Sequence, residues 1–175
     1  HYQNISTIMF LNPEVAAVGL NEQQAEEHKI PIRVSKVDYS TIARAIAMRK
    51  TNGFFKIIVS DDDDMKILGM RAVGEHASSA IQAVALLIYM NKGLDELVHM
   101  IHPHPSIVEG VQECVRMLVG KSVYKSSIFK DKLKCYRRTT DGEILPLHVL
   151  STSPEHSMNR EKIRDINKSD FHKEY

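Results

Sequence analysis

Alternating apolar and polar positions predict several short strands in the first half of the chain. Residues 5–20 contain two strand-like segments, interrupted by an Asn-Pro dipeptide. Residues 31–39 alternate as a half-buried strand does. Residues 53–60 and 66–74 form two further candidates, joined by four consecutive aspartates. The pattern therefore predicts a hairpin that follows three earlier strands.

Apolar residues at helical spacing predict helices, and the longer helices follow the predicted strands. Asn21 is a suitable N-cap for the first helix, and the longest helix is expected to start at Ser78 or Ser79 and to stop at Gly93. The predicted helices cover residues 22–28, 43–48, 78–92, 95–100 and 106–120. Because the strands come first in the sequence and the longer helices come later, the pattern favours an α+β fold, with an antiparallel sheet and helices packed on one face.

Composition narrows the class of protein. The 175 residues, 43% of them hydrophobic, suffice for one domain with a tail, and no apolar run has transmembrane length. A net charge of +1 does not indicate a nucleic-acid binder. The two cysteines argue against a disulfide-framed secreted domain and favour a reducing, cytoplasmic setting. The chain begins at His1 without a methionine, so we expect an excised fragment.

The charge balance changes near Gly120. Residues 1–120 carry 11 basic and 14 acidic side chains, whereas residues 121–175 carry 12 and 8. Asp141-Gly142 predicts a turn in a small hairpin. Residues 151–175 are polar, and we expect them to be partly disordered or to form a helix on a neighbour.

The most chemically distinctive stretch runs from Ile101 to Glu109 and holds two histidines and two prolines. Proline disfavours the α region for the residue before it, so His102 and His104 are expected outside a helix. Ser106 and Glu109 form an S-x-x-E capping box for the following helix. A carboxylate that binds one imidazole nitrogen raises the basicity of the other. The simpler interpretation is that Glu109 only caps its helix and His104 only fills a loop.

Two groups of residues could be interpreted as metal sites, but both have less support in the sequence than the pair His104 and Glu109. The aspartate run Asp61–Asp64 lacks the glycine and the terminal glutamate of a calcium loop, so a charged hairpin turn is favoured. His99, His102 and His104 are possible zinc ligands, but the adjacent prolines and the lack of a well-placed third ligand argue against them. We therefore predict no metal site.

The sequence His104-Pro105-Ser106-Ile107-Val108-Glu109 resembles the His-Pro-Thr-x-x-Glu signature of the pyridine nucleotide-disulfide oxidoreductases, especially their dihydrolipoamide dehydrogenase branch. The residues from Phe10 to Gly19 resemble the opening of the same family's interface domain. The segment around Arg44 resembles the family more weakly, and there we expect a solvated or interface charge. By this resemblance His104 is the catalytic acid/base, Glu109 orients it, and His104 with Pro105 contacts the flavin across a dimer.

The resemblance implies a division at residue 124, with a dimerisation domain over 1–124 and a basic, polar extension over 125–175. It also implies a homodimer whose parent chain binds FAD and NAD(P) in other domains. The sequence contains no C-x-x-x-x-C redox motif and no G-x-G-x-x-G fingerprint, so this fragment is not expected to bind these cofactors or to act alone. The alternative is a dimerisation module without catalysis.

Overall fold

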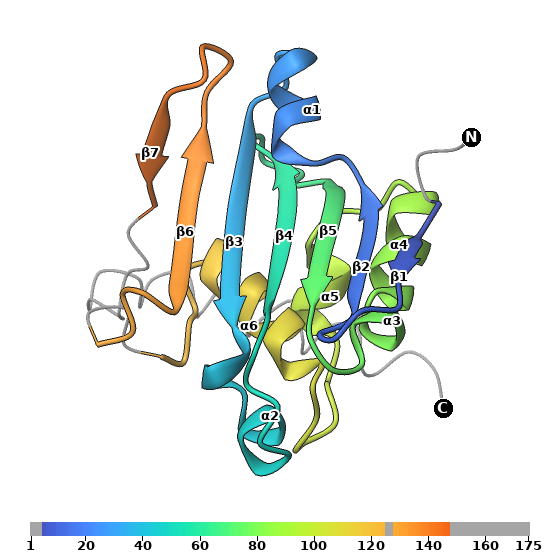
Figure 1. Ribbon diagram of the computed structural model, residues 1–175. Coiled ribbons are helices and arrows are strands. Elements are labelled where there is room, and N and C mark those ends of the chain that lie inside the picture. Colours follow the sequence, from blue (N-terminus) through green and yellow to red (C-terminus); the bar gives the residue numbers. More distant parts are fainter. Residues whose placement is uncertain (1–4, 125–127, 148–175) are drawn as a thin grey trace, which may run out of the picture.

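The computed structural model describes residues 5–124 and 128–147, which build a seven-stranded antiparallel sheet with helices against it (Figure 1). The strand order is β1-β2-β5-β4-β3-β6-β7. The strands are β1 (Thr7–Met9), β2 (Val15–Gly19), β3 (Ile32–Asp38), β4 (Phe54–Ser60), β5 (Ile67–Val73), β6 (Leu133–Arg138) and β7 (Ile144–Pro146). The helices are α1 (Glu22–Glu27), α2 (Ala43–Ala47), α3 (Ala77–Ala80), α4 (Gln82–Tyr89), α5 (Asp95–His99) and α6 (Glu109–Leu118), with a 3-10 turn η1 over Tyr39–Thr41.

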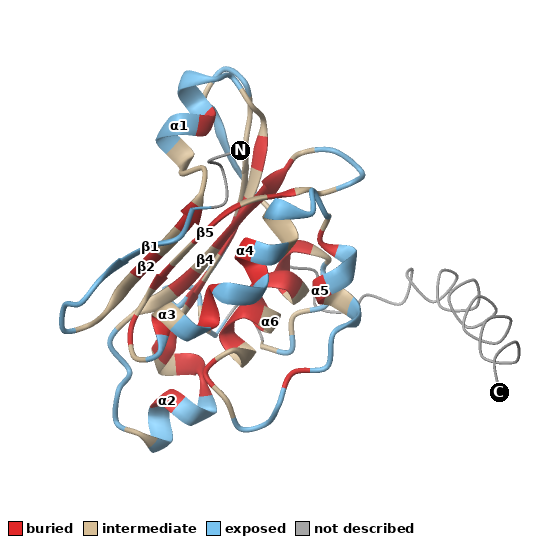
Figure 2. Ribbon diagram, turned by 90° about the vertical axis from the view of Figure 1, so that its right-hand side faces the viewer, coloured by how far each residue is buried: buried red, intermediate tan, exposed pale blue. Residues whose placement is uncertain are grey.

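Helices α3, α4 and α6 pack on one face of the sheet, and the predicted α+β arrangement is confirmed (Figure 2). The main core lies between this face and the helices. Its buried members include Phe55, Ile57 and Met70 from the sheet, and Val84 and Val111 from the helices. Burial of these apolar side chains is the main force that holds α6 against β3 and β4.

Helix α1 is the exception, because it covers part of the opposite face. Asn21 caps it as predicted, and Gln24 completes a capping box by accepting from the Asn21 N–H at 2.9 Å. Ala25 is fully buried in a second apolar cluster. The other buried members of that cluster are Ile32, Val34 and Ile58.

The strands predicted in the first half are confirmed, but β3 is not half-buried. It lies between β4 and β6 in the sheet. Val34 packs in the cluster under α1, and Val37 packs in the main core on the other face. Ser35 is fully buried as well. The apolar–polar alternation did not reveal this, because a buried serine and an exposed one look alike in sequence.

The long helix expected over residues 78–92 is divided, so that prediction is wrong in its bounds. Helix α3 begins at Ala77, after His76 in the left-handed conformation, and Ile81 separates it from α4. Both halves contribute small or apolar residues to the core. The longest described helix is α6, with ten residues. No helix within residues 5–124 or 128–147 has the length and apolar character needed to cross a bilayer.

The small hairpin predicted near Asp141-Gly142 is present, and it pairs Tyr136–Arg138 with Ile144–Pro146. Strand β6 pairs with β7 on one side and with β3 on the other, with Ser35 opposite Cys135. Residues beyond 124 therefore add strands β6 and β7 to the sheet that the earlier strands form. The interpretation of residues 151–175 lies outside the described residues, and the division at residue 124 stays a prediction.

Candidate functional site

The loop that carries His102, Pro103, His104 and Pro105, called the His-Pro loop below, connects α5 to α6 on the helical side of the sheet (Figure 1). His102 and His104 both lie outside the helices, as the neighbouring prolines predicted. The His104–Pro105 peptide bond is cis. Ile107 anchors the end of the loop, since its side chain is buried in the main core.

The Glu109 carboxylate binds two residues of this loop. His104 Nδ1 lies 2.7 Å from Glu109 Oε1. The backbone N–H of Ser106 donates to Glu109 Oε2 over 2.9 Å. The two residues that the sequence singled out are therefore hydrogen-bonded to one another, and the carboxylate holds the imidazole in one orientation.

The predicted N-cap at Ser106 is wrong. Helix α6 begins at Glu109, and Val108 occupies the N-cap position without a side-chain hydrogen bond. The Ser106 hydroxyl is buried and has no hydrogen-bond partner among the described residues. Only the reverse half of a capping box exists, in which the glutamate accepts from the serine backbone, because residues 107–108 form a turn before the helix.

The surroundings of Glu109 favour its ionised form. Burial alone would raise the pKa of Glu109, but hydrogen bonds from the Ser106 backbone and the His104 ring, with the charge of Arg116, outweigh burial and lower the pKa below its usual value. An ionised carboxylate accepts a proton-bearing Nδ1, which leaves Nε2 of His104 for chemistry. The side chain of His104 is 73% exposed. Its reactive nitrogen is therefore accessible from outside the chain.

His102 does not share this environment. It is buried, and its Nδ1 has no hydrogen-bond partner among the described residues. Burial lowers the pKa of His102, and the nearby charge of Arg116 lowers it further. The folded structure therefore favours the neutral form of this ring. Among residues 5–124 and 128–147, no three His, Cys, Asp or Glu side chains gather into a possible metal site.

The two cysteines are not exposed. Cys114 and Cys135 are both free, and both are buried in the main core. Burial raises the pKa of both thiols, so neither is a thiolate at neutral pH. A redox role for either cysteine has no support in this geometry.

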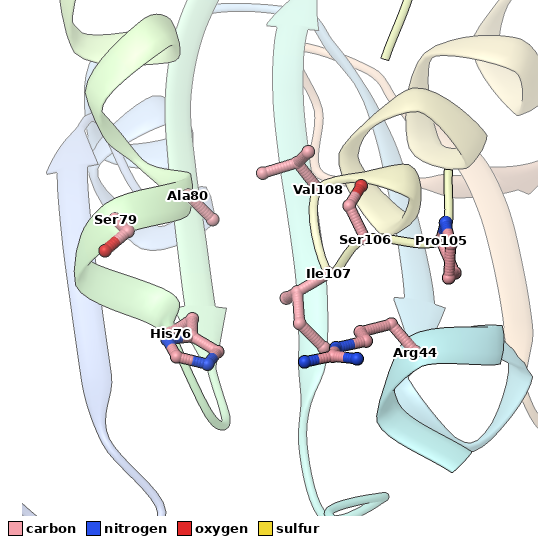
Figure 3. A pocket seen from close by; sticks show the side chains of 8 residues that line it. All are labelled: Arg44, His76, Ser79, Ala80, Pro105, Ser106, Ile107 and Val108. Carbon is pink, nitrogen blue, oxygen red and sulfur yellow. The ribbon is translucent and has the colours of Figure 1, made fainter. Parts of the chain in front are cut away.

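A groove of about 470 Å³ lies beside the His-Pro loop, and the sequence did not predict it. Figure 3 shows the guanidinium of Arg44, from α2, facing His76, from the start of α3, across the groove. The lining residues are Arg44, His76, Ser79, Ala80, Pro105, Ser106, Ile107 and Val108. They come from three segments that are far apart in sequence, so no local motif could have assembled them.

Comparison with known proteins identifies the family of the domain that carries the His-Pro loop. Residues 5–115 match the model of the pyridine nucleotide-disulphide oxidoreductase dimerisation domain. The chain belongs to this family. It is similar to the dihydrolipoyl dehydrogenases of Chlamydia trachomatis (37% identical) and Geobacillus stearothermophilus (31% identical), each over 123 residues that cover 70% of this chain.

Structural likeness agrees with the dimerisation-domain assignment. The HOCl-induced flavoprotein disulfide reductase RclA of Escherichia coli superposes with a TM-score of 0.63 and 26% identity over 66% of this chain. LpdA of Mycobacterium tuberculosis has the same TM-score at 24% identity and supports the fold alone. The chain spans only 26% of the length of these dihydrolipoyl dehydrogenases and of RclA. What it matches in this family is the dimerisation domain.

Proposed function

We propose that this domain supplies His104 and Glu109 as an acid/base pair to the redox disulfide and flavin of a second copy in a homodimer. The parent protein would then be an FAD- and NAD(P)-dependent dithiol/disulfide oxidoreductase of the dihydrolipoyl dehydrogenase type. The observation that carries the proposal is the 2.7 Å contact between His104 Nδ1 and Glu109 Oε1 on a ring that is largely exposed.

The exposure of His104 argues that its substrate comes from outside this chain. Both cysteines of the sequence are accounted for in the core, and no other thiol is available. A base that is held by a carboxylate and directed outward needs a reacting group on another polypeptide or a bound molecule. A dithiol substrate beside a partner's disulfide meets that need.

Exposed apolar side chains beside the His-Pro loop and on α4 support the homodimer. Ile101 is 93% exposed next to the buried His102, and Met100 is exposed beside it. Helix α4 exposes Leu86 and Tyr89, and Met90, which follows the helix, is exposed as well. Large exposed apolar side chains are common at protein interfaces. A second copy would cover them and bring a disulfide within reach of His104.

The chain's own part in the reaction is proton transfer. Nε2 of His104 accepts a proton from one thiol of the dithiol, and the resulting thiolate attacks the partner's disulfide, breaking its S–S bond and releasing one cysteine thiolate. Glu109 stabilises the imidazolium formed at His104. By resemblance, His104 and Pro105 are the residues of this chain that would contact the flavin. FAD, when bound, supplies the electron transfer between the dithiol and the nicotinamide.

Replacement of His104 by glutamine in the parent enzyme tests the proposal. We expect turnover with dihydrolipoamide to fall by two to four orders of magnitude, the usual contribution of general acid–base catalysis, while flavin absorbance stays unchanged. His99→Gln, an exposed histidine at the end of α5, is the matched control. Turnover that survives His104→Gln would remove the residue from the mechanism and favour a dimerisation module without catalysis.

A further inference from the structure

The groove beside the His-Pro loop adds a second feature to the proposed active site. Its volume of about 470 Å³ falls in the range of sites that hold small molecules. Arg44, Pro105 and Ser106 lie on one side of the groove, and His76 and Ser79 lie on the other (Figure 3). Because Pro105 directly follows His104 in the chain, the loop that carries the proposed base also lines the groove.

The charge of the groove selects for an anion. None of its eight lining residues is acidic. Arg44 makes no ion pair with any residue that the structure describes. Its guanidinium presents a rigid set of donors that matches the two oxygens of a carboxylate.

The rest of the lining selects for a hydrocarbon. Ala80, Pro105, Ile107 and Val108 present apolar surface. Ile107 is held in place by the core, so this part of the groove is preformed. A ligand that combines an apolar chain with an anionic end fits both parts of the lining.

We infer that this groove binds the carboxylate end of the dithiol or disulfide substrate, with Arg44 as its main contact. The inference rests on the proposed function, because it places the sulfur-bearing end of the same molecule at His104. Arg44 then determines substrate preference, in contrast to the solvated or interface charge expected from the sequence. The substrate class that the groove selects is a short aliphatic dithiol with a free carboxylate.

Two dithiols that differ only in this group test the inference. Dihydrolipoate carries a carboxylate, whereas dihydrolipoamide carries a neutral amide in its place. We expect Arg44→Met in the parent enzyme to raise the KM for dihydrolipoate about tenfold, the effect of one charge-assisted hydrogen bond, and to leave the KM for dihydrolipoamide within about twofold. Arg49→Met, which removes an arginine that does not line the groove, should change neither value.

A rise in KM of equal size for both dithiols, or no rise for either, would overturn the inference. If the wild-type enzyme oxidises neither dithiol, the proposed function fails. Calorimetric titration with lipoate then tests the groove separately, because it measures binding and does not require turnover. Lipoate binding that Arg44→Met weakens about tenfold would support it. No lipoate binding, or binding that Arg44→Met leaves unchanged, would refute it.

Discussion

Gly110 lies so close to Phe55 that a Cβ at position 110 would come within 2.4 Å of Phe55 Cδ2. Helix α6 can therefore pack this closely against β4 only because residue 110 has no side chain. We expect Gly110→Ala to lower the free energy of unfolding by about 1–3 kcal/mol, as overpacking does, and to displace the neighbouring Glu109. Urea unfolding measures the loss, with Gln112→Ala on the same helix as the control. Equal stability of the variant and the wild type would show that the contact relaxes freely.

Glu109 has two roles, and one substitution should reveal both. Glu109→Ala removes the acceptor for His104 Nδ1 and for the Ser106 N–H. We expect turnover of the parent enzyme to fall by about 10- to 100-fold, less than for His104→Gln, because the base itself remains. Unfolding should show a loss of about 1 kcal/mol. Glu96→Ala, on the exposed side of α5, is the control, and wild-type turnover in Glu109→Ala would exclude an orienting role.

Asp61 should stabilise the fold above about pH 4. Burial alone would raise its pKa, but hydrogen bonds from Arg33 (2.6 Å) and Arg137 (2.8 Å) outweigh burial and lower the pKa below the usual 3.8. A group whose pKa is lowered on folding contributes stability that is complete above its unfolded pKa and is lost as pH falls through the folded value. We expect Asp61→Asn to cost about 1–2 kcal/mol at pH 7 and progressively less below pH 4.

Unfolding of the wild type and Asp61→Asn as a function of pH checks this prediction, with the exposed Asp63→Asn as the control. A difference that persists undiminished at pH 2.5 would mean that packing, and not charge, accounts for the loss.

Glu113 should have the opposite pH dependence. Its side chain is buried on α6, and burial raises its pKa above 4.5, although a hydrogen bond from Ser122 partly offsets this. The folded state therefore favours the protonated form, and ionisation costs stability as pH rises through 4.5 and beyond. We expect Glu113→Gln to stabilise the protein by about 1 kcal/mol at pH 7 and to have no effect below pH 4.

Thermal unfolding at pH 7 and at pH 3.5 measures this change, with Glu96→Gln as the control. A less stable Glu113→Gln at pH 7 would mean that the contacts of the carboxylate with Ser122 and Arg116 outweigh its burial.

Local patterns predicted the elements whose causes are local. The hairpin β4–β5 has the bounds that alternation and the aspartate turn indicate, and Asn21 caps α1 as its side chain predicts. The start of α6 and the break after α3 were missed. At the first place the Ser106 hydroxyl is buried and does not cap the helix, and at the second the apolar run is divided at Ile81.

By itself the sequence determined the class of fold, the family and the pair His104 and Glu109. Periodicity, turn residues and a six-residue motif are all encoded in neighbouring positions. Only the tertiary structure decided that His104 is exposed while His102 is buried, that β6 extends the sheet beside β3, and that Arg44 and His76 face one another across a groove. These features depend on contacts between segments that are distant along the chain, and one sequence carries no direct signal of such contacts.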